Sequence, residues 1–202
     1  MKRWLVLGLL VCACGSSNNN NNNGVDAGSG SITGTVGGQP LAVKDAIFTI
    51  TQNNAVLVLI ADRGNLCSLI AGTTLPGTTT VLLLSLANFV PPSTVNAHVT
   101  GDYAFFDLGP GNLPTTAGRY WFGEFDIVDT TCAATATHFA TGGTVTVTQT
   151  GSTAAHLKAN LTGLQFGTDT LNGSMEATYC AALANSSCGG ALIARPSGFA
   201  AE

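Results

Sequence analysis

After residue 30, apolar and polar residues alternate mainly with a period of two, the spacing of a β-strand that buries one face. The first such stretch begins at Ser31. Two apolar, β-branched runs follow, Ala46–Ile50 and Ala55–Ala61, and the polar residues between them are typical of a hairpin turn. The pattern therefore predicts one strand and then a β-hairpin in the first part of the domain.

Further strands are predicted in the middle of the chain. Leu66–Ile70 follows a polar turn, and Thr79–Leu86 follows Pro76-Gly77. A helix over Val81–Ala87 is an alternative, but the threonines before it and the prolines after it leave little length for one. Tyr103–Leu108 is predicted as a short strand in a loop-rich region.

The most aromatic predicted strand is Arg119–Val128. Its alternation places Trp121, Phe125 and Ile127 on one face. The other face carries Tyr120, Phe122, Glu124 and Asp126. Flat aromatic surfaces beside carboxylates commonly hold sugars in β-domains, so this second face is a candidate ligand-binding site if it is open to solvent. The alternative is that another sheet or a loop covers the face and makes it part of the core.

The clearest alternation lies in the last third of the chain. Valines alternate with threonines in Gly143–Gln149, and Leu157–Leu161 follows with its apolar residues predicted to face inward. The side chains predicted to face outward are His156, Lys158 and Asn160. The phase slips at Gly163, where a β-bulge would absorb one residue, before a last strand at Leu171–Tyr179. About nine short strands predict an all-β fold, an antiparallel β-sandwich with a β-barrel as the alternative.

The first residues follow a different pattern, a basic Lys2-Arg3 and then the unbroken apolar run Trp4–Val11. This pattern is typical of an export signal, and the run is too short to span a membrane, which needs about 20 residues. Val11-Cys12-Ala13-Cys14 resembles the lipobox of bacterial lipoproteins, in which the cysteine after the cleavage site is acylated. The resemblance implies that residues 1–13 are removed and that Cys14 carries the lipid. An ordinary secretory signal with two incidental cysteines is the alternative.

Acylation would anchor the chain to a membrane, because two or more acyl chains hold a protein stably and lipoproteins of the resembled kind carry three. Gly15 stands where an aspartate commonly retains enteric lipoproteins in the inner membrane, so the outer membrane is the expected location. Residues 14–30 are rich in Asn, Ser and Gly and are predicted to form a disordered tether. The β-domain then spans residues 31–190, and residues 191–202 form a tail.

An even number of cysteines in an exported chain predicts disulfides. Four cysteines remain after Cys12 is removed and Cys14 is acylated, namely Cys67, Cys132, Cys180 and Cys188. They allow three pairings. The short segment between Cys180 and Cys188 favours a local bridge, which leaves Cys67 for Cys132. A zinc site is the alternative, but there is no CxxC pair, and ligand spacing is lacking among the three histidines, His98, His138 and His156.

Charge restricts the possible partners. Only 9% of the residues are charged and the net charge is −4 at pH 7. Removal of Lys2 and Arg3 with the signal leaves five basic and eleven acidic residues, a net charge of −6. So few cations cannot make the phosphate contacts on which nucleic-acid affinity depends. We therefore expect no nucleic-acid partner, a membrane link through the lipid, and an envelope protein or a glycan as partner.

No catalytic motif is evident. The sequence lacks a G-x-S-x-G elbow, and its histidines show no triad pattern. Glu124 and Asp126 have a spacing that a glycosidase pair allows, although carboxylates so placed are usually solvated. Asp126 with Asp129, and Asp102 with Asp107, lack the dense spacing of a calcium loop. We expect no catalytic residue, no metal and no cofactor.

The closing segments GTVTVTQ and LTGLQFGTDTLNGSMEATYC, together with the lipobox and the Asn/Ser/Gly tether, resemble lipoproteins of unassigned function that myxobacteria encode. This resemblance implies no catalytic residues. Three hypotheses follow. The first is a lipid-anchored envelope lipoprotein without enzymatic activity, structural or protein-binding. The second is a surface carbohydrate-binding module that uses the Tyr120–Asp126 face, and the third is an envelope hydrolase. We favour the first.

Overall fold

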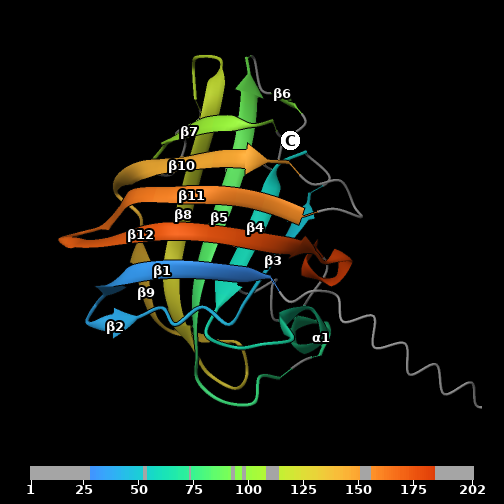
Figure 1. Ribbon diagram of the computed structural model, residues 1–202, viewed down its shortest axis with the longest axis vertical. Helices are drawn as coiled ribbons and strands as arrows, with labels where there is room; N and C mark the ends of the chain where they lie inside the picture. Colours follow the sequence, from blue (N-terminus) through green and yellow to red (C-terminus); the bar gives the residue numbers. More distant parts are fainter. Residues whose placement is uncertain are drawn as a thin grey trace, which may run out of the picture.

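The structure, a computed structural model, describes residues 28–51, 54–72, 74–91, 94–96, 99–107, 114–150 and 156–184 (Figure 1). The all-β prediction is confirmed for these residues. The strands are β1 (Ser29–Val36), β2 (Gln39–Pro40), β3 (Asp45–Ile50), β4 (Val56–Ala61), β5 (Thr79–Val90), β6 (Thr94–Asn96), β7 (Gly101–Phe105), β8 (Gly118–Val128), β9 (Ala134–Phe139), β10 (Gly142–Gln149), β11 (His156–Phe166) and β12 (Asp169–Tyr179). Two short helical segments accompany them, α1 (Leu66–Ala71) and the 3₁₀ turn η1 (Ala181–Ala184).

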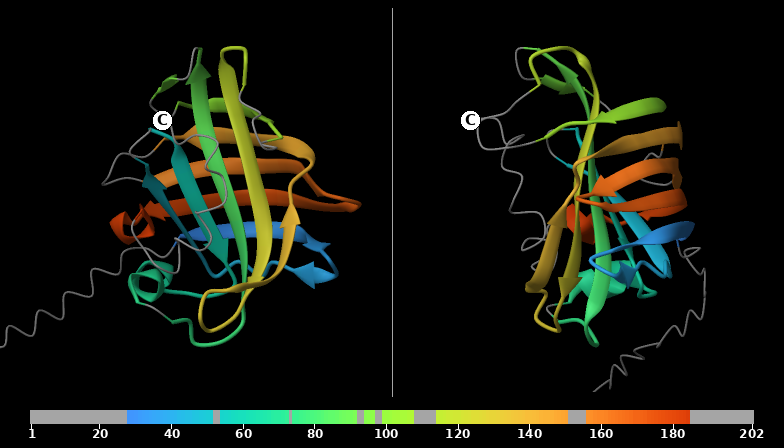
Figure 2. Two further views of the ribbon diagram at one scale, coloured as in Figure 1. Left: turned by 180° about the vertical axis from the view of Figure 1, so that it is seen from behind. Right: turned by 90° about the vertical axis from the view of Figure 1, so that its left-hand side faces the viewer.

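Eight of these strands close into a barrel, in the order β12-β11-β10-β7-β8-β5-β4-β3. The ring closes because Thr178 and Tyr179 of β12 pair in parallel with Ile47 and Phe48 of β3. Of the two predicted architectures, the structure therefore has the barrel and not the preferred sandwich. Strands β1, β2, β6 and β9 extend the sheet outside the ring. The strands β7, β10, β11, β12 and β1 cross in front of the steep strands β8, β5 and β4, so the barrel has two walls (Figures 1 and 2).

The interior of the barrel is filled with apolar side chains from both walls, which is the usual solution for a barrel of eight strands. The largest of them are Trp121, Tyr103, Phe48 and Phe125. Leu157, Ala159 and Leu161 also point inward, as the alternation predicted. The predicted bulge is present as well, since the register of β11 against β12 shifts between Leu161 and Leu164 and Gly163 has a φ of 58°.

A second apolar cluster lies outside the barrel, where α1 and η1 cover β3, β4 and β5. It includes Ile47, Leu59, Leu66, Val81 and Leu183. The prediction of a strand over Leu66–Ile70 is wrong, because this segment is α1. Leu66 and Ile70 are the buried residues of the helix, and their spacing of four places both side chains on one helical face.

The disulfide pairing differs from the one we favoured. Cys67 on α1 is bonded to Cys180, which follows β12, although the two lie 113 positions apart. Cys132 is disulfide-bonded as well, so neither Cys180–Cys188 nor Cys67–Cys132 forms. The physical reason is the closure of the barrel. Because β12 runs beside β3, and both α1 and η1 pack on β3, the two cysteines meet with their Cα atoms 5.7 Å apart.

Several sequence predictions concern residues outside the described ranges. The predicted export signal, Cys14 and all but the last three residues of the predicted tether lie before residue 28, and Cys188 and the predicted C-terminal tail lie after residue 184. The disorder predicted for Ser29 and Gly30 is wrong, because both residues belong to β1. His98 also falls in a gap. Strand β1 begins at Ser29, two positions earlier than the predicted start of the domain.

The buried carboxylate of Asp45 holds α1 in place. Its Oδ2 accepts a hydrogen bond of 2.8 Å from the backbone N–H of Leu66, and its Oδ1 accepts one of 2.8 Å from Ala46. Asp45→Ala would leave both buried donors without this acceptor, so the free energy of unfolding should fall by about 2 kcal/mol in a urea titration. Asp45→Asn, which keeps one carbonyl oxygen, should lose less. Equal stability of wild type and Asp45→Ala would contradict this role.

Tyr103 fastens the loop before β7 to the barrel core. Its hydroxyl donates a hydrogen bond of 2.8 Å to the carbonyl of Val99 and accepts one of 3.1 Å from the Val99 N–H. Tyr103→Phe should therefore lower the free energy of unfolding by about 1 kcal/mol.

Burial raises the pKa of Tyr103 above its ordinary value of 10.0, against the opposing effects of the Val99 hydrogen bond and the Arg119 charge. The neutral phenol is thus favoured in the folded state. The contribution of the neutral Tyr103 phenol to the free energy of unfolding is complete below the pKa of tyrosine in the unfolded chain. It is lost as the pH rises through the raised pKa of the folded state. Unfolding curves recorded by circular dichroism below and above pH 10 should show a steeper loss of stability above pH 10 for wild type than for Tyr103→Phe. Parallel losses would refute the assignment.

Candidate functional site

The four side chains predicted to form a ligand-binding face do lie together, on the outer face of β8. Trp121 and Phe125, at the alternate positions, point into the barrel core. On the neighbouring strand β5, Leu83 lies opposite Glu124 and Val81 lies opposite Asp126. The strand and its two faces were thus predicted correctly from the alternation.

The exposure of this face decides what it can contact. Glu124 is 6% exposed and Asp126 is 1% exposed, whereas Tyr120 and Phe122 are half-buried. The Tyr120 hydroxyl lies 2.8 Å from the Thr116 hydroxyl, and its ring packs edge-on against Phe106. The two carboxylates are therefore covered, and the open face that a sugar-binding platform requires is not present at their positions.

The histidines lie apart from these carboxylates in the described part of the chain. His138 of β9 packs its ring against Phe125, on the barrel side of the sheet and thus opposite the Glu124 face. His156 of β11 lies with its Nδ1 3.3 Å from Oε1 of Glu176 on β12. The hydrolase hypothesis requires a histidine or a further carboxylate beside Glu124 or Asp126, and neither of these two histidines takes that place.

The aspartates considered for calcium serve local structure. The Asp102 carboxylate accepts a hydrogen bond of 2.7 Å from the Thr146 hydroxyl. The Asp129 carboxylate accepts bonds from the Thr131 hydroxyl and from the backbone N–H groups of Thr131 and Ala133 in the turn after β8. These bonds, that of the Thr131 hydroxyl first, lower the pKa of Asp129. Within the described ranges, no three potential metal ligands are grouped together.

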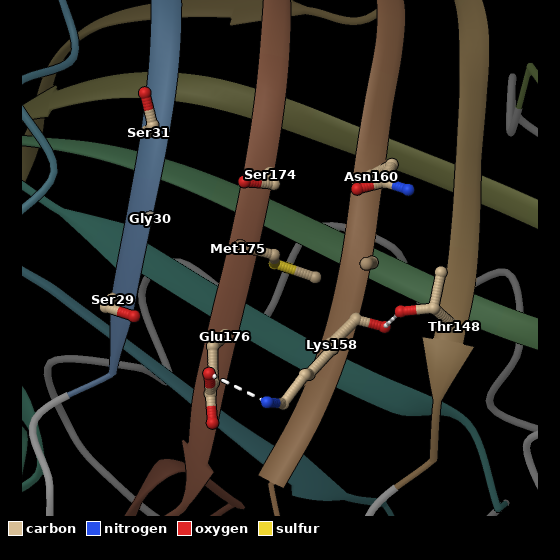
Figure 3. A pocket seen from close by; sticks show the side chains of 10 residues that line it. Ser29, Gly30, Ser31, Thr148, Lys158, Asn160, Ser174, Met175 and Glu176 are labelled. Carbon is tan, nitrogen blue, oxygen red and sulfur yellow. Dashed lines mark hydrogen bonds and ion pairs between the residues drawn. The ribbon is translucent and has the colours of Figure 1, made fainter.

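A polar hollow lies on the opposite wall, on the outer face of β1, β12, β11 and β10 (Figure 3). It has a volume of about 400 Å³. The side chains around it are Ser29, Ser31, Thr148, Lys158, Asn160, Ser174 and Glu176, with Gly30, Ala159 and Met175 between them. Hydroxyl groups, an amide and one charged pair thus converge from four strands.

The strand register arranges these side chains in two rows. Ser29, Glu176 and Lys158 lie side by side across β1, β12 and β11. The Lys158 Nζ is 3.1 Å from Glu176 Oε2. In the next row, Ser31, Ser174 and Asn160 lie on the same three strands. The row continues to Thr146 on β10.

The alternation of residues along β11 predicted that Lys158 and Asn160 lie on an outer face, but it did not predict this hollow. The missing information was the order of the strands. Ser31 and Ser174 are 143 positions apart, and they become neighbours because β1 pairs antiparallel with β12. The only local signal was the run of small polar side chains on each strand, which is common on solvent-facing sheets.

The chain was compared with protein-family models, with curated proteins and with solved structures, and no match was found in any of the three comparisons. In the part of the chain that the structure describes, no helix has the length and apolar character needed to cross a bilayer.

Proposed function

We propose that this chain is a lipid-anchored lipoprotein of the bacterial cell envelope, and that its barrel is a binding module without enzymatic activity. The observation that carries the proposal is the Cys67–Cys180 disulfide, which joins α1 to the end of β12. Structural disulfides form and persist in oxidising compartments such as the periplasm and the cell surface. This location agrees with the export signal and with the lipobox at Cys14.

The distribution of side chains supports a binding role on the outer surface. Apolar side chains fill the barrel interior, so a ligand would meet the outside of the sheet. Glu124 and Asp126 are buried, and His138 and His156 lie elsewhere. The expected partners are a membrane, through the lipid on Cys14, and an envelope protein or a glycan. The small number of cations argues against nucleic acid.

The anchor can be tested with the full chain in a Gram-negative host grown with radiolabelled palmitate. Wild type should incorporate label and sediment with outer membranes on a sucrose gradient. Cys14→Ser should lose the label completely, because the acylated thiol is removed. Cys12→Ser is the matched control and should keep both label and location.

Two results would contradict the anchor. One is wild-type protein without label. The other is that Cys14→Ser protein still incorporates palmitate while Cys12→Ser protein does not. This result would mean that the lipid is carried by Cys12 and not by Cys14.

A further inference from the structure

The side chains of the polar hollow have hydrogen-bonding capacity that the fold does not use. Within the described residues, the side chains of Ser31, Ser174 and Asn160 make no hydrogen bond to protein groups. Together they offer two hydroxyls, which both donate and accept, and one amide with separate donor and acceptor atoms. All three are exposed to solvent. A ligand with many hydroxyl groups would find complementary partners in this row.

The charge of the hollow points to an uncharged ligand. Its cation Lys158 and its anion Glu176 are 3.1 Å apart and largely neutralise each other. An anionic ligand would meet the Glu176 carboxylate, and a cationic ligand would meet the Lys158 ammonium. Glu176 Oε1 also lies 3.3 Å from Nδ1 of His156, so both oxygens of this carboxylate have a protein neighbour. Each of the two groups still keeps free donor or acceptor positions, since an ammonium has three donors and a carboxylate about four acceptor sites. Both can therefore bond to a neutral hydroxyl.

The surroundings argue against a protein segment as the occupant. Strands β12, β11 and β10 are each paired on both sides, so β-augmentation within the hollow is blocked, and a peptide strand could add only at the outer edge of β1, beside the hollow. The apolar side chains at its floor, Ala159 and Met175, are 2% and 3% exposed, so no large apolar side chain is available there to anchor a protein partner. The functional groups that can make directional contacts with a ligand are the hydroxyls, the amide and the charged pair. The hollow is open to solvent and has a volume of about 400 Å³, so it would contact one side of a ligand and leave the other side in water.

We propose that the hollow formed by β1, β12, β11 and β10 binds an uncharged saccharide. The hydroxyl groups of the saccharide form hydrogen bonds with the side chains of Asn160 and Ser174 and with the Lys158–Glu176 pair. The inference rests on the proposed function only in that an envelope anchor brings the domain close to glycans. This site lies on the wall opposite Tyr120, so it is distinct from the sugar-binding face that the sequence suggested.

Saturation-transfer difference NMR on the processed, acylated protein in detergent micelles tests the proposal. The probes are maltotriose, cellotriose and N,N′,N″-triacetylchitotriose, with trigalacturonate as the charged comparison. At least one neutral trisaccharide should bind, with a Kd of about 0.1–1 mM, and trigalacturonate should bind at least tenfold more weakly. Binding measured on purified protein does not depend on where the protein is anchored, so this test and the palmitate test can fail separately.

Variants then locate the site. The double variant Asn160→Ala/Ser174→Ala should weaken binding at least tenfold, while its melting temperature stays close to that of wild type. Thr144→Ala/Thr162→Ala, on the same wall but outside the hollow, is the matched control and should change the Kd less than twofold. The proposal is overturned if no neutral probe binds, if trigalacturonate binds as well as the neutral probes, or if the control pair weakens binding equally. Loss of binding in Tyr120→Ala but not in the hollow variant would also overturn it.

Discussion

Replacing Cys67 and Cys180 together by alanine is expected to lower the free energy of unfolding by about 2–5 kcal/mol. The reason is the size of the loop that the bond closes, because the two cysteines are 113 positions apart. A long cross-linked loop restricts the unfolded chain strongly. In the folded state the disulfide also links α1 to the start of η1, and these two elements cover the outer apolar cluster. Without the disulfide, α1 and η1 should therefore detach from the sheet before the barrel itself unfolds. Guanidinium titrations of both proteins without reductant give the difference.

The single variant Cys180→Ala is the control for the pairing. It leaves Cys67 without its partner, so alkylation of the unfolded, unreduced protein should label Cys67. If Cys180 were instead bonded to Cys188, the label would appear on Cys188. Unchanged stability of the double variant, or label on Cys188, would contradict the bond between α1 and the end of β12.

Trp121→Ala should cost about 3–5 kcal/mol of unfolding free energy. Trp121 is 0% exposed and lies in the barrel interior, with its ring edge-on to Phe105 at 5.5 Å. Its indole N–H donates a hydrogen bond of 3.1 Å to the carbonyl of Gly143 on β10, on the opposite wall. Truncation to alanine therefore opens a large cavity and removes a polar link between β8 and β10.

Far-UV circular dichroism during denaturation measures this effect, since it does not depend on tryptophan. Phe139→Ala is the matched control, because Phe139 is 59% exposed at the end of β9 and its loss should change stability by about 0.5 kcal/mol or less. If Trp121→Ala does not fold, Trp121→Phe takes its place. The phenylalanine ring fills part of the cavity, so the free energy of unfolding of Trp121→Phe should be lower than that of Phe139→Ala, although the protein still folds. A Trp121→Ala variant no less stable than Phe139→Ala would show that this side chain does not hold the walls together.

The local pattern was sufficient for most strands. The hairpin of β3 and β4, the aromatic strand β8, and the meander β10–β12 were predicted because their apolar residues alternate. Even the bulge at Gly163 was visible, since the phase of the alternation changes there. In each case the signal comes from neighbouring residues that contact the same core.

The features that depend on distant contacts were not predictable in the same way. Closure into a barrel rests on two parallel pairings, β3 with β12 and β7 with β8, which no local pattern announces. The Cys67–Cys180 bond follows from that closure, so a choice based on the shortest loop was wrong. The segment of α1 was too short for its helical spacing to outweigh its strand-like composition.

For the candidate sites too, features set by neighbouring residues were predictable and features set by distant contacts were not. The shared face of Tyr120, Phe122, Glu124 and Asp126 followed from alternation, but the burial of the two carboxylates did not. Their alternation with apolar residues is the same whether the outer face is covered or open. The polar hollow depends on the order β1-β12-β11-β10, so its side chains were known only one strand at a time.

Mass spectrometry of an unreduced tryptic digest, made from protein of the membrane fraction, tests the central claim of an acylated and disulfide-bonded barrel most directly. Cleavage at Arg63, Arg119 and Lys158 separates Cys67 from Cys180. We predict that the peptide 64–119 is linked to the peptide that begins at Ala159, and that the first peptide begins at an acylated Cys14. A peptide that runs from Trp4 through an unmodified Cys14, with free thiols at Cys67 and Cys180, would contradict the account.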